Sequence, residues 1–227
     1  GSGADEADLF DSYTNLRHID PKIAEQMLKE AKEIMDPLEV QFFLRQGTCL
    51  GAIRDKSFIP WDDDIDLGCV IGLNGLTEDM IDPVFDAFRD RGYFVSLESN
   101  DRWIAAGMVK GELRVDLTFF RIIDDSIFHF PLIWIPARLF SHLKEIDFMG
   151  EKFLVPNPPE EYLRAKYGPN WVTPKKVYEQ DVLDQVVDLA VPGIDVRALV
   201  GARQKPGSPI LCALDRQAPG AHGDEAG

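Results

Sequence analysis

The sequence has few cysteines and an unusually small share of basic residues. Its three cysteines, Cys49, Cys69 and Cys212, form neither a CxxC pair nor a dense framework, which excludes a disulfide-stapled scaffold and favours a reducing compartment. Lys and Arg number 24 against 39 Asp and Glu, so the formal net charge is −15. Because phosphate backbones are bound by concentrated basic residues, this charge argues against a general nucleic-acid-binding protein. An anionic ligand must be met locally, by a metal or a few basic residues.

The sequence also lacks a long uninterrupted apolar run. The longest candidate, FHFPLIWIPARLF from Phe128 to Phe140, is shorter than the roughly 18 residues of a membrane span and contains two prolines. We interpret it as buried core or an interfacial patch, and we expect no transmembrane segment and at most a peripheral association with membranes.

The residues that are present suffice for one substantial core, since 45% of the 227 residues are hydrophobic. Apolar periodicity predicts a helix from Pro21 to Met35, capped by Asp20 and ended by Asp36 and Pro37. Two more helices are expected at residues 76–92 and 158–168, and a short one begins in the segment 47–56.

Short apolar or alternating segments predict a β-sheet. The expected strands are residues 40–47, 65–72, 93–98, 103–110 and 113–120, followed by a hairpin at 146–155. The pattern predicts an α+β fold, with a mixed β-sheet flanked by helices and a C-terminal helical segment. We expect residues 1–19 to be an N-terminal extension and 20–200 one domain. Residues 201–227, rich in Gly, Pro and Ala, are expected to be a disordered tail.

The stretch FIPWDDDIDLG, from Phe58 to Gly68, places four carboxylates in five positions. Such crowding of like charges requires a counter-ion or full solvation. If Ile65 and Leu67 face the core, strand alternation turns Asp64 and Asp66 to one open face, ~6.5 Å apart at their Cα atoms. The later strand LRVDLTFF repeats this alternation and offers Asp116 on its polar face. The spacing therefore predicts a divalent-metal site.

The acidic stretch is compatible to different degrees with three other kinds of site. A solvated surface loop fits poorly with the Pro-Trp pair before the stretch and the alternating apolar residues after it. An EF-hand matches at Asp62, Asp64 and Asp66 but fails at Leu67 and Leu73, where a turn glycine and a bidentate glutamate are required. A DxD glycosyltransferase remains open, because it also binds a metal-bound nucleotide diphosphate with two aspartates.

The segment before the acidic stretch adds candidate substrate contacts. Gly47 and Thr48 open a predicted helix whose backbone amides and dipole can receive a phosphate, and Arg54 follows on a nearby face. A glycine-led helix start followed by DxD on the next strand is an arrangement that nucleotidyltransferases use. We therefore assign Gly47, Thr48, Arg54 and Asp62 as candidate substrate-binding residues.

Two segments resemble the LicD family: RQGTCLGAIRDKSFIPWDDDIDLG at residues 45–68 and PPEEYLRAKYGPNWVTP at residues 158–174. The resemblance covers residues 37–174, and the family includes bacterial phosphocholine transferases and, more distantly, fukutin and fukutin-related proteins. It implies a nucleotidyltransferase-like fold that moves a phospho-alcohol group from a CDP-linked donor to a glycan hydroxyl and releases CMP.

The resemblance also implies roles for particular residues. By position, Asp64 and Asp66 are metal ligands, Asp116 is the third ligand and general base, and the cofactor is Mg²⁺ or Mn²⁺. The implied partners are a CDP-linked donor and a glycan acceptor. The sequence has neither the zinc-binding type of cysteine cluster associated with fukutin-related protein nor a stem or membrane helix, so we expect a cytoplasmic protein at the membrane face, with the Golgi lumen as the alternative. The chemistry is consistent, because a diphosphate leaving group needs its charge neutralised and an aspartate can take the acceptor proton. A DxD glycosyltransferase and a catalytically inactive binding domain of the same fold remain alternatives.

Overall fold

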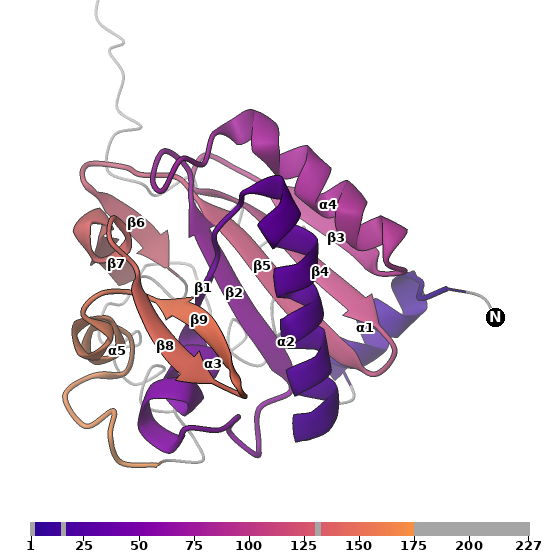
Figure 1. The fold of residues 1–227 in the computed structure, drawn as a ribbon, viewed down its shortest axis with the longest axis horizontal. Helices are drawn as coiled ribbons and strands as arrows, with labels where there is room; N and C mark the ends of the chain where they lie inside the picture. Colours follow the sequence, from indigo (N-terminus) through magenta and orange to yellow (C-terminus); the bar gives the residue numbers. More distant parts are fainter. Residues whose placement is uncertain (1–2, 15–16, 130–132, 175–227) are drawn as a thin grey trace, which may run out of the picture. The chain divides into compact units, whose positions relative to one another are not determined.

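The computed structural model describes residues 3–14, 17–129 and 133–174, all within the compact unit Gly1–Lys176. These residues form an α+β fold around a five-stranded mixed sheet (Figure 1). The predicted tail at 201–227, and the end of the predicted domain at 20–200, lie outside the described residues.

The strands of the central sheet follow the order β1, β2, β5, β4, β3. Their bounds are β1 Phe43–Leu44, β2 Asp64–Val70, β3 Phe94–Ser99, β4 Trp103–Lys110 and β5 Leu113–Phe120. The β2–β5 pair is parallel and the other pairs are antiparallel. This confirms the predicted α+β class and four of the five predicted strand positions. The parallel β2–β5 pair lies at the centre of the sheet.

Helices α2 (Pro21–Met35) and α4 (Ile81–Asp90) pack together on one face of the sheet, where α2 crosses in front in Figure 1. The Asp20 carboxylate accepts hydrogen bonds from the amides of Lys22, at 2.9 Å, and Ile23, at 3.4 Å, which confirms the predicted cap. The ring of Phe85 in α4 lies 5.5 Å from that of Phe119 in β5, so this face is closed by apolar packing.

The opposite face of the sheet is contacted by helix α1 (Glu6–Thr14), which belongs to the residues expected as an N-terminal extension. Its Leu9 is buried, and the carbonyl of Ser12 accepts a hydrogen bond from Arg114 of β5 at 3.1 Å. Helix α5 (Pro159–Tyr167) confirms the predicted C-terminal helix and contacts α3 (Gln46–Leu50).

The predicted strand at residues 40–47 is wrong in extent, because only Phe43 and Leu44 pair with β2. Arg45 is extended, and Gln46, with a φ of +46°, then begins α3. The helix continues as a π-helical turn, η2 (Gly51–Asp55). The chain therefore leaves the sheet at Arg45, whose side chain reaches the candidate site.

Two hairpins complete the described residues. Strands β8 (Lys144–Phe148) and β9 (Glu151–Val155) confirm the predicted hairpin, whose turn residues Met149 and Gly150 have φ values of +53° and +77°. The apolar run at residues 128–140 falls on β6 (Ser126–His129), β7 (Ile133–Pro136) and the turn η4 (Ala137–Phe140), which the sequence analysis did not predict. Phe128, Ile135 and Phe140 are buried, as expected of core residues.

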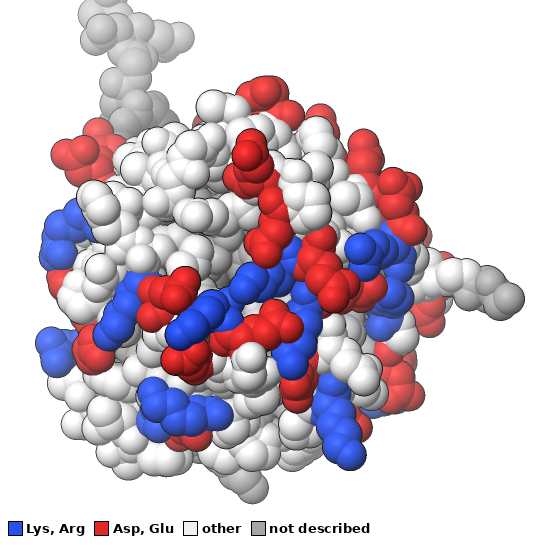
Figure 2. Space-filling view, in the orientation of Figure 1, with Lys and Arg blue, Asp and Glu red and all other residues white. Residues whose placement is uncertain are grey.

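The surface carries both signs of charge side by side. On the face drawn in Figure 2, Lys and Arg side chains lie among Asp and Glu side chains. Ion pairs such as Lys110 with Glu30, at 2.7 Å, illustrate this interspersion. Among the helices of the described residues, none has both the length and the apolar character that crossing a membrane requires.

Candidate active site

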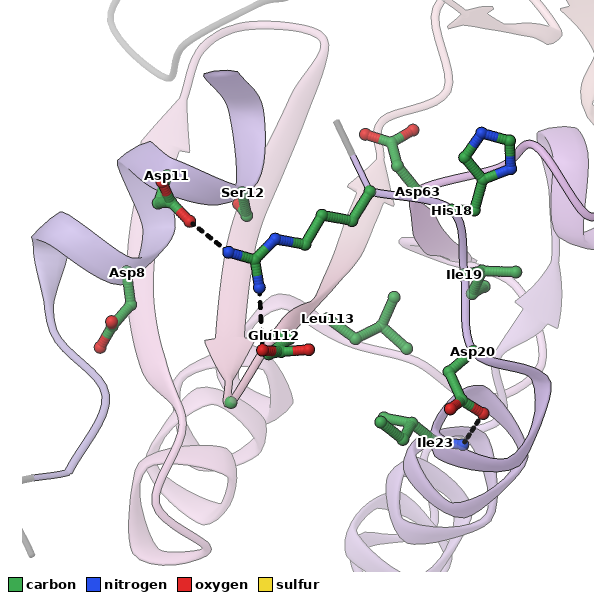
Figure 3. A pocket seen from close by; sticks show the side chains of 12 residues that line it. Asp8, Asp11, Ser12, His18, Ile19, Asp20, Ile23, Asp63, Glu112 and Leu113 are labelled. Carbon is green, nitrogen blue, oxygen red and sulfur yellow. Dashed lines mark hydrogen bonds and ion pairs between the residues drawn. The ribbon is translucent and has the colours of Figure 1, made fainter. Parts of the chain in front are cut away.

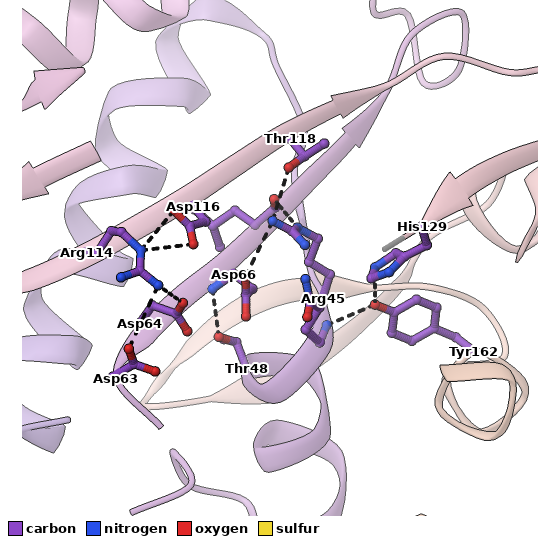
Figure 4. Close-up of polar contacts among 12 residues, drawn as sticks. Arg45, Thr48, Asp63, Asp64, Asp66, Arg114, Asp116, Thr118, His129 and Tyr162 are labelled. Carbon is purple, nitrogen blue, oxygen red and sulfur yellow. Dashed lines mark hydrogen bonds and ion pairs between the residues drawn. The ribbon is translucent and has the colours of Figure 1, made fainter. Parts of the chain in front are cut away.

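The three aspartates predicted as metal ligands lie together on one face of the central sheet (Figure 4). Asp64 and Asp66 are two residues apart on β2 and therefore point to the same side. The parallel register pairs Asp66 with Asp116 of β5. One carboxylate oxygen from each of the three lies within 4.8 Å of the others. Such oxygens are the hard ligands that Mg²⁺ and Mn²⁺ prefer, so the cluster fits a divalent ion.

This face is less open to solvent than the open polar face predicted from strand alternation. Asp66 is only 8% exposed, whereas Asp64 and Asp116 are half-buried. The reason is that α3 packs against β2, where the Thr48 hydroxyl accepts a hydrogen bond from the Asp66 amide at 2.9 Å. The cluster is therefore partly shielded from water, which strengthens its electrostatic interactions.

Arg114 joins two of the three aspartates. Its Nη2 atom forms an ion pair with Asp64, and its Nε atom lies 3.1 Å from both carboxylate oxygens of Asp116. The same Nη2 is 3.9 Å from the Asp63 carboxylate. Because Arg114 and Asp116 are two residues apart on β5, their side chains share the polar face of the strand.

Arg45 is the counter-ion of the third aspartate. Its Nη2 atom lies 3.4 Å from an Asp66 carboxylate oxygen and donates to the Thr118 hydroxyl at 3.1 Å. Its Nε donates to the carbonyl of Leu67 at 2.8 Å. Figure 4 shows the Arg45 side chain lying across β2 and β5. Two buried guanidinium groups thus hold three carboxylates in place, as charged groups out of water require.

The two arginines do not offset the three carboxylates fully. Burial, followed by repulsion from Asp64, raises the pKa of Asp66 well above its ordinary value. Burial also raises the pKa of Asp116 to about 6, although Arg114 opposes this shift. The fully ionised cluster is therefore unfavourable by itself, and a divalent cation would stabilise it.

Three of the predicted substrate-binding residues, Gly47, Thr48 and Asp62, lie at or against the start of α3. Gly47 lies at the start of α3, and a Cβ at this position would collide with the Asp62 carboxylate. Asp62 therefore covers the glycine that the sequence analysis assigned to a phosphate. Thr48 is engaged by the Asp66 amide, and the Gln46 amide donates to the Tyr162 hydroxyl at 2.9 Å.

Comparison with known protein families identifies the chain's relatives. A family model described as "LicD/FKTN/FKRP, nucleotidyltransferase domain" matches residues 39–158, more than half of the sequence. The chain belongs to the LicD family. The match contains the three aspartates, Arg45 and Arg114, whereas α1 and α5 lie outside it.

Individual relatives share modest identity with this LicD-family chain. Human "Ribitol-5-phosphate transferase FKTN" is 28% identical over 169 residues, which are 70% of this chain and 35% of the relative. "Lipopolysaccharide cholinephosphotransferase LicD" of Haemophilus influenzae is 59% identical over 29 residues, 13% of this chain and 11% of that protein. The chain therefore spans about a third of the length of the fukutin relatives it matches.

One solved structure was also compared with the LicD-family chain. The crystal structure of ANT(2")-Ia in complex with adenylyl-2"-tobramycin aligns with a TM-score of 0.42 and 15% identity. The alignment covers 79% of this chain and 97% of that one. A likeness at this level supports no inference about the chain.

Arg54, the fourth predicted substrate-binding residue, lies in the π-helical turn η2. Its Nε and Nη2 atoms each lie 2.8 Å from one oxygen of the adjacent Asp55 carboxylate. The Arg54 side chain is only 6% exposed, so this ion pair is largely shielded from water. Its assignment as a donor contact remains a prediction.

A buried lysine lies on the α5 side of the site. Lys166 is 9% exposed, and burial lowers its pKa to about 8, an effect that Asp66 opposes. One helical turn earlier, Tyr162 is fully buried and its hydroxyl lies 3.4 Å from His129 Nε2. Because the Gln46 amide also donates to this hydroxyl, Tyr162 attaches α5 to the start of α3.

A pocket of about 230 Å³ adjoins the cluster between α1, the start of α2 and the β4–β5 turn (Figure 3). Its wall includes Asp63, which also approaches Arg114 of the cluster. Among the other lining residues, Arg17 pairs with Glu112 at 2.8 Å and with Asp11 at 3.8 Å. The pocket thus combines hydrogen-bonding groups with the apolar side chains of Ile19 and Leu113, and Asp63 links it to the cluster.

Sequence reasoning did not assign roles to Arg45, Arg114 and Lys166. Arg114 had a usable signal, since it alternates with Asp116 on the polar face of a predicted strand. Arg45 had none, because it follows a two-residue strand and reaches Thr118, 73 residues away in sequence. Lys166 lies on a predicted helix, where a lysine is ordinarily exposed.

Proposed function

We propose that this protein is a metal-dependent transferase that moves a phospho-alcohol group from a CDP-linked donor to a glycan hydroxyl and releases CMP. Membership of the LicD family and likeness to proteins named as ribitol-5-phosphate and choline phosphate transferases support this class of reaction. The observation that carries the proposal is the convergence of the Asp64, Asp66 and Asp116 carboxylates.

In the proposed reaction, the acceptor oxygen forms a bond to the phosphorus that carries the alcohol. The bond from that phosphorus to the bridging oxygen breaks, and the bridging oxygen leaves with CMP. The hydroxyl proton passes to the Asp116 carboxylate, which acts as the general base. When bound, Mg²⁺ or Mn²⁺ neutralises the diphosphate charge and polarises it for attack.

The charges of the cluster predict the order of binding affinities. When ionised, the four carboxylates of Asp63, Asp64, Asp66 and Asp116 outnumber the two guanidinium groups and repel an anionic donor. A divalent cation held by Asp64, Asp66 and Asp116 would remove this repulsion. We therefore expect the donor to bind weakly without the metal and much better with it.

The donor's contacts are proposed from the neighbouring residues. Because the Asp62 carboxylate covers Gly47, a phosphate at the Gly47 amide would meet a like charge. We therefore expect the donor phosphates to bind at the metal rather than at the Gly47 amide. We expect hydroxyl groups of the donor to donate hydrogen bonds to the Asp62 carboxylate. Thr48 in α3 and Arg54 in η2 remain candidates for contact with the donor.

The remaining partner and its location follow from the proposed reaction. The glycan acceptor approaches from the pocket side, where Asp63 and Glu112 offer acceptors for sugar hydroxyls. We propose a cytoplasmic location at the membrane face, with the Golgi lumen as the alternative. Cys49 and Cys69 are unpaired and buried, which is consistent with a reducing compartment.

A nucleotide-release assay tests the proposed function. The protein is incubated with Mg²⁺, a mixture of glycan acceptors and CDP-choline, CDP-glycerol, CDP-ribitol or a UDP- or GDP-sugar, and the released nucleotide is identified by chromatography. We expect CMP from a CDP-linked donor, and none from the Asp64→Asn variant. Release of a nucleoside diphosphate from a sugar donor would instead identify a DxD glycosyltransferase. No release from any donor would indicate an inactive binding domain.

A further inference from the structure

Helix α1 contributes two contacts to the guanidinium group of Arg114. The Ser12 carbonyl accepts a hydrogen bond from Nη1 at 3.1 Å, and the Tyr13 ring centre lies 4.0 Å from Cζ. The other side of the group bonds to Asp64 and Asp116. Arg114 is 3% exposed, so it is enclosed between α1 and two candidate metal ligands.

Gly107 of β4 provides the space that Tyr13 occupies. It pairs directly with Asp116 in the antiparallel register of β4 and β5. A Cβ at residue 107 would collide with the Tyr13 hydroxyl oxygen and would lie 3.6 Å from the nearest Asp116 oxygen. Gly107 is not among the residues with positive φ, so space rather than backbone conformation requires the glycine.

We propose that Tyr13 is a positioning residue of the candidate metal centre. Its ring holds the Arg114 guanidinium in place, and Arg114 in turn orients the Asp64 and Asp116 carboxylates for the metal. This inference rests on the proposed function, because it concerns the same metal centre. It makes α1, which lies outside the residues matched by the family model, part of the site.

Replacing Tyr13 separates the effect of carboxylate orientation on metal affinity from the effect of charge. Because a neutral tyrosine is replaced by a neutral residue, the net charge of the cluster stays the same. A change in metal affinity then reports the orientation of the carboxylates rather than their number. Losing a partner that orients metal ligands typically lowers affinity about 10- to 100-fold. A ring over a guanidinium is replaced well by phenylalanine but not by leucine.

The first experiment measures Mn²⁺ binding by calorimetry to the full chain and three variants. We expect Tyr13→Leu to weaken Mn²⁺ binding about tenfold, and Tyr13→Phe to bind like the wild type because the ring is retained. Phe10→Leu is the matched control, since Phe10 is an aromatic residue of the same helix that is 51% exposed. Its Mn²⁺ affinity should not change.

The second experiment perturbs Tyr13 without replacing it. Gly107→Ala should weaken Mn²⁺ binding, because its methyl group displaces the tyrosine hydroxyl. In the Tyr13→Phe background the same change should have little effect, since the next nearest atoms are 3.5 Å or more from the new methyl. This pair of measurements decides the question even if Tyr13→Leu fails to fold.

The outcomes separate the inference from the proposed function. Wild-type affinity in a folded Tyr13→Leu variant would overturn the role of Tyr13 while leaving the metal centre intact. An equal loss on Gly107→Ala with tyrosine or phenylalanine at residue 13 would do the same. Absence of Mn²⁺ binding by the wild type would overturn the metal centre and this inference together.

Discussion

The two faces of the β2–β5 pair are built from the same strands with opposite chemistry. On one face, Ile65, Leu117 and Phe119 are fully buried against the side closed by α2 and α4. On the other face, Asp66 and Arg114 are almost as deeply buried but are charged. Strand alternation alone separates these residues.

The difference lies in what stabilises each face. The apolar face is stabilised by the burial of hydrocarbon, which is proportional to area and needs no specific partner. The polar face depends on ion pairs, because a buried charge that loses all of its partners destabilises the folded state. We therefore expect changes on the apolar face to affect stability and changes on the polar face to affect function.

Neutralising an aspartate of the polar face should have the largest effect, and it should act on activity. Asp64→Asn removes a ligand charge, and a metal ion supplies several kcal/mol of transition-state stabilisation. We expect a loss of CMP release on the order of a thousandfold. The melting temperature should be equal or higher, because repulsion within the cluster falls while Arg114 keeps Asp116 and Asp63 as partners. Near-normal turnover at saturating Mg²⁺ would show that Asp64 is not a ligand.

A truncation on the apolar face should show the reverse pattern. Leu117→Ala should lower the free energy of unfolding by about 2–5 kcal/mol, because it removes buried methylene groups and leaves a cavity. Activity per folded molecule should be retained. Urea unfolding and the release assay on the same sample measure both quantities. A large loss of activity in the folded fraction would mean that the two faces are not separable.

Lys166 tests whether burying a charged group destabilises the site side of the molecule. Burial lowers its folded-state pKa from 10.5 to about 8, so the unfolded chain binds more protons between these values and stability rises with pH there. Lys166→Met should be more stable than the wild type at pH 7, by roughly 1–3 kcal/mol, and the difference should shrink as the pH approaches 10.5. Thermal unfolding from pH 7 to 10.5 measures it.

The matched control for Lys166 is the exposed Arg164 on the same helix. Arg164→Met removes the same charge without relieving burial, so its stability should change little at any pH in this range. Equal stabilisation by the two substitutions would refute the burial argument.

The smallest effect expected is a change of metal affinity with pH. Burial raises the pKa of Asp116 to about 6, and a metal binds the ionised carboxylate, so protons compete below that pH. Apparent Mn²⁺ affinity should fall at least about tenfold per pH unit below 6, and the raised pKa of Asp66 adds proton competition in the same direction. Calorimetry between pH 5 and 8 measures this, and a flat profile would contradict the assignment of Asp116.

Much of the polar face was predictable because its signals are local. The alternation in DIDLG and LRVDLTFF places Asp64, Asp66 and Asp116 on polar faces of their strands without any knowledge of the fold. The cap at Asp20 and the turn at Met149 and Gly150 are likewise encoded within a few residues.

The remaining features depend on contacts between distant parts of the chain. Ser12 and Arg114 are 102 residues apart, and Gln46 and Tyr162 are 116 apart. Local patterns do not specify such pairs. The short α1 helix escaped prediction because it has one buried residue, Leu9, and no repeating apolar face. The predicted strand at 40–47 was too long because the turn at Gln46 is set by α3 and α5 packing.

The most direct test of the central claim is the coupling between donor and metal. CDP-choline, CDP-glycerol and CDP-ribitol are titrated by calorimetry with Mg²⁺ or Mn²⁺ and in EDTA, using the wild type and Asp116→Ala. We predict metal-dependent binding, in which donor and metal raise each other's affinity by the same factor, as linkage requires. The coupling should be weaker in Asp116→Ala. Equal binding of the CDP compounds in EDTA, or metal-dependent binding of UDP- or GDP-sugars alone, would contradict the account.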